Sequence, residues 1–282
     1  MASPHRVKAY AKINLFLEIT ERRSDGYHIL STLFQTISLA DELTLTPAET
    51  LRLTCSDASL PTDERNLVMR AAQLLKNRLG ETKGVHIHLG KQVPTGAGLG
   101  GGSSDAGTAL TALAKFWRRQ PAATLLHKSA LQLGADVPFF LQGGTCAAGG
   151  IGDKLRPLPA LPKTWLVLVY PGFGVSTKEA YAKVQVALKG KKSIHKMIPL
   201  LSNPRPTAWV GHMFNRFEEF IFPDHPELPK LKQALLDAGA LGALMSGSGS
   251  SVFGIVENEN QGRKMLAVIR KSYPQSWLVH TV

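Results

Sequence analysis

The residues best suited to chemistry in this 282-residue chain form one glycine-rich stretch, Pro94 to Ala106, with the sequence PTGAGLGGGSSDA. Its five glycines let the backbone approach a ligand without intervening side chains. The stretch leads into a segment with helical spacing, and a helix start offers unpaired N–H groups and the positive end of the helix dipole. The sequence therefore predicts a loop that binds phosphate oxygens. A flexible linker or a glycine-rich hairpin is the alternative.

The segments on either side of this loop predict how it is held. Before it, Val85, Ile87 and Leu89 alternate with histidines, as in a half-buried strand. After it, Ser103 and Ser104 are suited to cap a helix. The apolar residues that follow recur at helical spacing: Ala106, Leu110, Leu113 and Trp117. The predicted order is strand, glycine loop, helix.

Two better-known phosphate-binding loops are excluded. A P-loop needs a lysine directly after its last glycine, and no lysine lies inside this stretch. Gly96 to Gly101 fits the dinucleotide-binding pattern Gly-x-Gly-x-x-Gly. However, no acidic residue stands between Asp105 and Asp136 to bind a ribose hydroxyl. A Rossmann fold is therefore not expected.

Lys12 and Asn14 lie two residues apart in a segment, residues 7 to 19, that alternates apolar and polar residues. This pattern predicts a strand with both side chains on the same face. A lysine there could stabilise the charge on a transferring phosphoryl group. From position alone, a lysine on the protein surface is the more common case.

Two further segments could carry chemistry. Asp136 precedes a proline and an apolar run, so it could cap a short helix or act as a general base. The segment Met245 to Ser251, MSGSGSS, lies between two predicted strands. It could be a plain hairpin connection or a second glycine loop that closes on phosphates.

Composition narrows the class of protein. Hydrophobic residues make up 44% of the chain, and its two cysteines, Cys55 and Cys146, do not form a zinc or disulfide pattern. No signal-peptide core or membrane-spanning run is present, so we expect a cytoplasmic protein without a membrane partner. The net charge of +12 would suit a polyanion. However, the basic cluster of Lys189, Lys191, Lys192 and Lys196 is not interleaved with aromatic residues, so no nucleic-acid partner is expected.

The pattern along the chain predicts an α+β fold with two domains. A passage rich in Gly and Pro, residues 149–162, is the best boundary, and it divides residues 1–155 from residues 156–282. Strands are predicted over residues 7–19, 29–39, 85–89, 165–170, 241–245 and 252–256. Besides the helix after the glycine loop, helices are predicted over residues 66–79, 123–133, 228–238 and 261–271, and from about residue 177.

Three segments resemble, in order and spacing, the motifs of the galactokinase–homoserine kinase–mevalonate kinase–phosphomevalonate kinase superfamily. They are Ala9 to Leu15 (AYAKINL), Pro94 to Ala106, and Ser246 to Ser251. Arg22 to His28 (RRSDGYH) and Gly134 to Pro138 (GADVP) are similar to one branch, which phosphorylates a cytidine diphosphate-linked alcohol for non-mevalonate isoprenoid biosynthesis. The resemblance implies a two-domain small-molecule kinase fold. An N-terminal ATP-binding domain with the first glycine loop and a smaller C-terminal domain with the second would form the active site in the cleft between them.

The resemblance also implies roles in phosphoryl transfer. ATP with Mg²⁺ would donate the phosphoryl group to the 2-hydroxyl of a methylerythritol unit. Asp136 would remove the hydroxyl proton, and Lys12 would position Asp136 and the hydroxyl and offset negative charge. Asn66 and Lys91 would lie near the adenosine. The remaining ATP-binding residues would come from the glycine loop, whose backbone N–H groups would hold the β- and γ-phosphates: Pro94, Thr95, Gly96, Ala97, Gly98, Leu99, Gly100, Gly101, Gly102, Ser103 and Ser104.

The same resemblance implies a site for the cytidine end of the substrate. Tyr27 would stack on the cytosine and His28 would bond its edge. Tyr181 would form the second side of the sandwich, with a helix core position as the alternative. Asn14 would contact the substrate near the reacting hydroxyl. The second glycine loop would add Gly247, Ser248 and Gly249.

Two departures from the family pattern stand out. In Asn215 to Glu218 (NRFE), Arg216 replaces an acidic residue, so no catalytic role is expected there. No acidic residue matches the magnesium-binding glutamate of mevalonate kinases, so the protein ligands of the metal stay open, with Ser104 as one candidate. A homoserine or mevalonate type of kinase is an alternative, in which Tyr27 and His28 would be bystanders. A basic nucleic-acid-binding module is another, and it would leave both glycine loops without a purpose.

Overall fold

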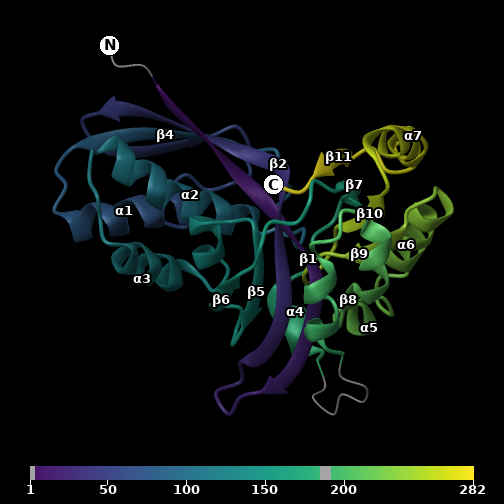
Figure 1. Ribbon diagram of the computed structural model, residues 1–282. Coiled ribbons are helices and arrows are strands. Elements are labelled where there is room, and N and C mark those ends of the chain that lie inside the picture. The colour runs from purple at the N-terminus through teal and green to yellow at the C-terminus, as the bar shows by residue number, and fades with distance from the viewer. Residues whose placement is uncertain (1–3, 185–191) are drawn as a thin grey trace. The chain divides into compact units, whose positions relative to one another are not determined.

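The computed structural model describes residues 4–184 and 192–282 and has an α+β architecture (Figure 1). It divides into two compact units. Unit 1 consists of Met1–Ala11, Leu39–Val93 and Gly100–Gly143, and unit 2 of Lys12–Ser38, Pro94–Leu99 and Gly144–Val282. Two long strands, β1 (His5–Arg22) and β2 (His28–Ala48), run through both units. The predicted division of the sequence into residues 1–155 and 156–282 stays a prediction.

Unit 1 packs helices on one face of a small sheet. The end of β2 pairs antiparallel with β4 (Gly84–Gly90), which pairs in parallel with β3 (Leu51–Cys55). The helices are α1 (Leu67–Leu79), α2 (Gly101–Phe116), α3 (Ala123–Leu133) and the 3-10 helix η1 (Val137–Leu141). Figure 1 shows α1, α2 and α3 together, and their apolar residues share one core with Leu45 and Ile87 of the strands. The predicted alternation of β4 is confirmed, since Ile87 is buried and His88 is exposed.

Unit 2 contains a four-stranded antiparallel sheet in the order β11-β7-β10-β9. The strands of that sheet are β7 (Trp165–Val169), β9 (Gly242–Met245), β10 (Val252–Val256) and β11 (Ser276–His280). Unit 2 also contains β5 (Thr145–Gly149), β6 (Lys154–Pro157) and β8 (Phe214–Asn215), which are outside this sheet. Its helices are α4 (Thr177–Ala182), α5 (Glu218–Ile221), α6 (Glu227–Asp237) and α7 (Glu259–Ile269), with short 3-10 turns over Ile194–Lys196, Ile198–Leu200, Pro206–Ala208 and Val210–His212. Leu231 and Leu235 of α6 and Met265 of α7 pack on Val167 and Val252 of the sheet to form the core.

The predicted helices and strands are confirmed within two or three residues, except that β2 extends to Ala48 instead of ending at Leu39. The extension forms because Leu43 and Leu45 continue the apolar alternation and pair with β4. The strands β3, β5, β6, β8 and β11 were not predicted.

Within residues 4–184 and 192–282, no helix is both long enough and apolar enough to span a bilayer. In the predicted basic cluster, Lys189 and Lys191 lie outside the described residues.

The prediction that Ser103 and Ser104 cap α2 is wrong. The helix begins at Gly101, and the cap residue Gly100 has φ 67°, a left-handed conformation that favours glycine. Ser104 therefore lies inside the first turn, where its N–H donates to the Gly100 carbonyl. Its buried Oγ donates to the Tyr10 carbonyl at 2.7 Å. The serine hydroxyl thus fastens α2 to β1 within unit 1.

Candidate active site

Lys12 lies in a part of β1 that is buried on both faces. Residues 11–19 are all buried, and β8 pairs in parallel with this part of the strand. The side chain is 5% exposed, so the expectation of a surface lysine is wrong. Lys12 Nζ donates to Asn14 Oδ1 at 2.7 Å and lies 5.3 Å from the centroid of the Phe34 ring. A cation removed from bulk water in this way acts strongly on a nearby anion.

Asn14 is fixed in the orientation that serves Lys12. Its Nδ2 donates to Thr32 Oγ1 at 2.8 Å, so its Oδ1 is the atom presented to the ammonium. Thr32 in turn donates to the Phe16 carbonyl at 2.7 Å. The amide is 1% exposed. The spacing of Lys12 and Asn14 on one strand face is therefore confirmed.

The first glycine loop turns its carbonyl groups toward the protein. Four consecutive carbonyls accept hydrogen bonds: Gly96 from Val175 N, Ala97 from Ser251 N, Gly98 from Ser246 Oγ and Leu99 from Lys12 N, at 2.9–3.2 Å. Among the described residues, none accepts a hydrogen bond from the N–H groups of residues 96–99. Gly96 and Gly98 have φ 67° and 76°, which allow this arrangement. The loop thus offers unpaired N–H donors, as a phosphate site requires.

The second glycine loop packs directly against the first. A Cβ on Gly98 would lie 2.0 Å from the Ser246 carbonyl oxygen, so only glycine fits there. A Cβ on Gly247, whose φ is 56°, would lie 3.1 Å from the Gly98 carbonyl oxygen and 3.4 Å from Lys12 Nζ. Lys12 and both glycine loops therefore converge in unit 2. The segment also closes a hairpin, since Ser246 N donates to the Ser251 carbonyl.

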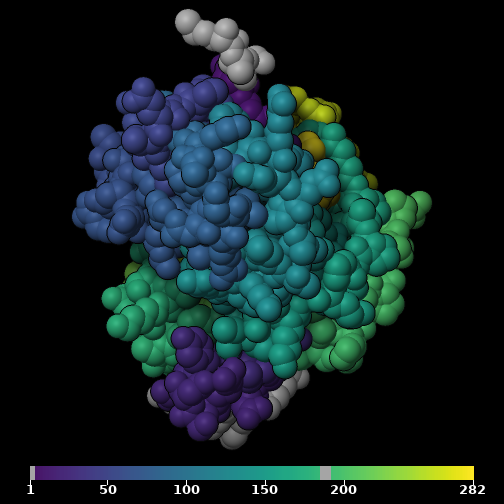
Figure 2. Space-filling view, turned by 90° about the vertical axis from the view of Figure 1, so that its left-hand side faces the viewer, coloured from purple at the N-terminus to yellow at the C-terminus, as the bar shows by residue number. Residues whose placement is uncertain are grey.

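The residues predicted for the cytidine lie near the β1–β2 turn of unit 2. Figure 2 shows this turn (purple, lower part) at the surface, and Tyr27 is 59% exposed. His28 is buried and stacks on Tyr181, with ring centroids 5.2 Å apart and planes 18° apart. Burial and the Arg22 charge lower the pKa of His28, which favours the neutral ring. Within the described chain His28 Nε2 has no hydrogen-bond partner. The three rings are thus an exposed phenol and a stacked pair with an unsatisfied ring nitrogen.

Asp136 occupies the cap position of η1, but its side chain makes no capping hydrogen bond there. The capping interpretation is therefore not supported. The turn that carries Asp136 is held by close packing on α2 in unit 1. A Cβ on Gly107 of α2 would lie 2.9 Å from Phe140 Cβ and 3.2 Å from the Val137 carbonyl oxygen. Gly107 thus permits an approach that fixes the backbone directly after Asp136.

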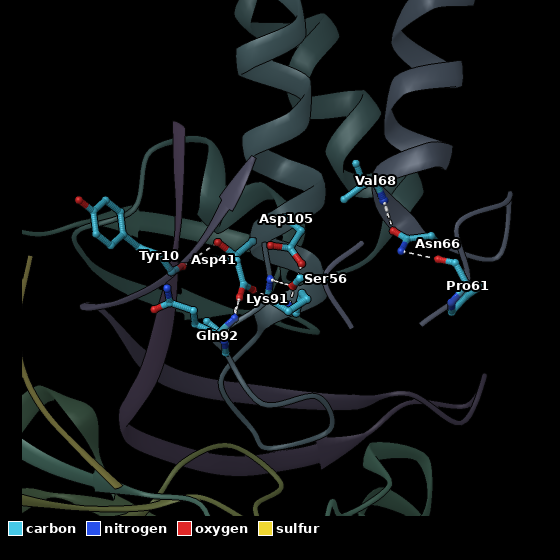
Figure 3. Close-up of polar contacts among 11 residues, drawn as sticks. Tyr10, Asp41, Ser56, Pro61, Asn66, Val68, Lys91, Gln92 and Asp105 are labelled. Atoms are coloured by element: carbon cyan, nitrogen blue, oxygen red, sulfur yellow. Dashed lines mark hydrogen bonds and ion pairs between the residues drawn. The ribbon is translucent and has the colours of Figure 1, made fainter. Parts of the chain in front are cut away.

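Lys91 and Asn66 are engaged with neighbours in unit 1 (Figure 3). Lys91 Nζ pairs with Asp41 and, at 3.0 Å, with Asp105 Oδ2. Asp41 also accepts hydrogen bonds from the N–H groups of Gln92 and Val93. Asn66 caps α1 by accepting from Val68 N at 2.9 Å, and its Nδ2 donates to the Pro61 carbonyl. The proximity of both residues to adenosine stays a prediction.

Sequence reasoning missed Asp41 and Asp105, although each is a charged residue within an apolar pattern. Burial and the neighbouring Asp41 charge raise the pKa of Asp105 to about 7, against the opposing effect of Lys91. Asp105 Oδ1 is buried and has no partner among the residues described. In the folded chain the acid therefore keeps its proton to a higher pH than in the unfolded chain. Its contribution to stability is fully present below about pH 4 and is lost as the pH rises toward 7.

We expect Asp105→Asn to make the chain more stable than the wild type at pH 8, by on the order of 1–2 kcal/mol. The amide has no charge to bury and keeps an oxygen for Lys91. The difference should vanish near pH 4. Urea unfolding from pH 4 to pH 8 measures it, with exposed Asp237→Asn as the control. Lower stability of Asp105→Asn at pH 8 would mean that the ionised carboxylate stabilises the fold.

Arg216 is buried in unit 2 and neutralised by acids. Its Nε and Nη2 donate to the two carboxylate oxygens of Glu18, each at 2.7 Å, and its Nη1 donates to Glu219. The Glu18 hydrogen bonds raise the pKa of Arg216, so it stays charged. Among the residues the structure describes, no group of three or more His, Cys, Asp or Glu is placed to hold a metal ion. The protein ligands of a metal therefore stay open.

Comparison with known proteins places this geometry in a family. Residues 66–144 match the family described as "GHMP kinases N terminal domain", and residues 197–275 match "GHMP kinases C terminal". The chain is 43% identical to a 4-diphosphocytidyl-2-C-methyl-D-erythritol kinase of Syntrophus aciditrophicus, over 98% of each chain. It is 42% identical to the Chlorobium phaeovibrioides protein of that name, over 97% of this chain and 95% of the relative.

A solved structure agrees with these relatives. The crystal structure of a 4-(cytidine 5'-diphospho)-2C-methyl-D-erythritol kinase is similar with a TM-score of 0.85 and 36% identity, over 98% of this chain and 99% of that one. The α+β fold, the two glycine loops and these similarities agree on one assignment. This chain belongs to the GHMP kinases and, within them, to the 4-diphosphocytidyl-2-C-methyl-D-erythritol kinase family.

Proposed function

We propose that this kinase transfers the γ-phosphoryl group of ATP to the 2-hydroxyl of 4-diphosphocytidyl-2-C-methyl-D-erythritol. The single observation that carries the proposal is the convergence of buried Lys12 with two glycine loops in unit 2. Relatives at 42–43% identity over nearly the whole chain bear the name of this activity. Homoserine or mevalonate as the acceptor would leave Tyr27 and the His28–Tyr181 stack without a role.

In the proposed reaction the substrate hydroxyl oxygen attacks the γ-phosphorus, the bond to the bridging oxygen of ADP breaks, and the hydroxyl proton passes to Asp136. Negative charge on the transferring group is offset by Lys12, whose ammonium is oriented by Asn14. The N–H groups of residues 96–99 bind the phosphates, joined by those of the first turn of α2. Ser104 adds no N–H donor, because its own is bonded to Gly100.

We propose that ATP is used together with Mg²⁺, which would offset part of the negative charge on the phosphate groups, with its protein ligands left open. A cytidine diphosphate group would bind with its base against Tyr27 and the His28–Tyr181 stack. The neutral His28 ring can donate or accept a hydrogen bond at Nε2. Gly247, Ser248 and Gly249 would line the substrate, with Ser248 Oγ held 3.1 Å from Thr177 Oγ1. A cytoplasmic location stays a prediction.

The proposal is tested by following ADP release with Mg²⁺–ATP and, in parallel, the cytidyl alcohol, homoserine and mevalonate. We expect turnover with the cytidyl alcohol alone. In Tyr27→Ala its KM should rise about 5- to 150-fold, since one aromatic–base stack is worth ~1–3 kcal/mol. Tyr27→Phe keeps the ring and should behave like the wild type. Turnover with another alcohol, or an unchanged KM in Tyr27→Ala, would contradict the cytidine site.

A further inference from the structure

A polar segment of unit 2, residues 215–218, forms hydrogen bonds with the backbone of the second glycine loop. Asn215, the last residue of β8, is 2% exposed. Its Nδ2 donates to two carbonyls at once, Met245 at 2.7 Å and Gly247 at 2.8 Å. Its Oδ1 accepts from Phe217 N at 3.0 Å. Both donors of the amide are therefore committed to the loop, and its oxygen fixes which way the amide faces.

Glu218 binds the backbone N–H of Met245, the residue whose carbonyl is bonded to Asn215. Its Oε1 accepts a hydrogen bond from Met245 N at 2.9 Å, and its Oε2 pairs with Lys232 of α6 at 2.6 Å. Met245 ends β9, whose other edge pairs with β10. The Asn215 and Glu218 side chains thus satisfy both backbone groups of Met245 on the edge without a partner strand. Unpaired buried backbone groups would be costly there.

Gly247 connects the hydrogen bonds of Asn215 with Lys12. The carbonyl of Gly247 is bonded to Asn215, while the Cβ direction of Gly247 lies toward Lys12 Nζ and the Gly98 carbonyl. Asn215 is also tied to the strand that carries Lys12, because it pairs with Leu17 of β1 and the next residue, Arg216, donates its N–H to the Leu17 carbonyl. The Asn215 side chain therefore links the second glycine loop to β1, in addition to the hydrogen bond that Asn14 N donates to Ser246 Oγ at 3.4 Å.

We propose that Asn215 and Glu218 are positioning residues for phosphoryl transfer: they hold the Met245–Gly247 backbone against Lys12 and the first glycine loop. This inference rests on the proposed kinase function and deepens it. It assigns a purpose to a segment for which no catalytic role was expected. Arg216 between them serves a separate purpose, since its guanidinium is bonded to Glu18 and Glu219.

The first test is Asn215→Asp, which keeps the size of the side chain and replaces both donors with an oxygen that repels two carbonyls. We expect kcat to fall about 10- to 100-fold, because small displacements of catalytic groups are costly. The KM for the cytidyl alcohol is measured in the same assay, because Gly247 lines the proposed substrate site and Phe217, whose N–H is bonded to Asn215, packs on Tyr181 at 4.9 Å. A rise in KM with an unchanged kcat would contradict the positioning role. Exposed Asn203→Asp is the matched control and should leave both constants unchanged.

The second test separates positioning from folding. Glu218→Gln keeps an oxygen for Met245 N and should retain kcat within about three-fold, whereas Glu218→Ala should lose activity as Asn215→Asp does. Melting temperatures and circular dichroism identify any unfolded fraction, and kcat is corrected for it. The inference would be overturned if folded Asn215→Asp or Glu218→Ala kept the wild-type kcat, or if Glu218→Gln and Glu218→Ala lost activity equally. Neither result would affect the proposed function. An inactive wild-type chain would overturn the proposed function and the inference with it.

Discussion

Replacing Asp136 with Asn is expected to lower kcat by ~10²–10⁴-fold, the range typical for the loss of a general base. The amide has nearly the same size but cannot take the hydroxyl proton. Asp136 sits at the start of η1 without capping it, on a turn fixed by the packing of Val137 and Phe140 against Gly107. The substitution should therefore leave the local backbone in place. Steady-state kinetics with the cytidyl alcohol measures the effect.

Two further measurements separate a lost base from a distorted site. The Kd for ATP should stay within about two-fold of the wild type, because the N–H donors of the glycine loop are unchanged. The KM for the cytidyl alcohol should also change little, because a base that acts only in the chemical step lowers kcat and kcat/KM together. Asp237→Asn at the exposed end of α6 is the control. Near-normal kcat in Asp136→Asn would show that another group takes the proton.

The sequence predicted those parts of the site that depend on local pattern. The two-residue spacing of Lys12 and Asn14 sufficed to place both side chains on one face, and the hydrogen bond between them confirms it. The glycines of Pro94–Leu99 predicted a loop whose backbone is open to a ligand, and the N–H groups of residues 96–99, unpaired within the described chain, fit that prediction. The start of α2 was misplaced because Gly100, a poor helix residue, takes the cap position in a left-handed conformation that the serines would resist.

The features of the site that the sequence did not predict depend on contacts between residues far apart in the chain. Lys12 is buried beside segments far along the chain: its Nζ lies 5.3 Å from the Phe34 ring centroid and would be 3.4 Å from a Cβ on Gly247 in the second glycine loop. The Asp41–Lys91–Asp105 cluster joins the middle of β2, the residue directly after β4 and the N-terminal half of α2. Asn215 and Glu218 act on a loop thirty residues away. The hydrophobic pattern of a segment indicates which of its residues share a face. It does not indicate which residues of distant segments contact them, and all of these partners come from distant segments.

Replacing Lys12 with Met is expected to lower kcat by ~10²–10³-fold, the loss typical when one preorganised donor to a developing anion is removed. The thioether fills the space of the buried aliphatic stem and can pack against Phe34, which the ammonium now faces. The variant leaves Asn14 Oδ1 without its 2.7 Å donor, but Asn14 stays anchored through Thr32. The fold should therefore persist while the electrostatic contribution is lost.

The kcat–KM split decides whether the charge of Lys12 acts in the transition state. If it does, kcat and kcat/KM for the cytidyl alcohol fall together and KM changes little. A rise in KM alone would instead assign Lys12 to ground-state binding. Lys8→Met provides the matched control, because Lys8 lies four residues earlier on the same face of β1 and is exposed. Lys12→Arg adds a geometric test. It keeps the charge but replaces a compact ammonium with a larger planar group beside Gly247, so kcat should not return to the wild-type value.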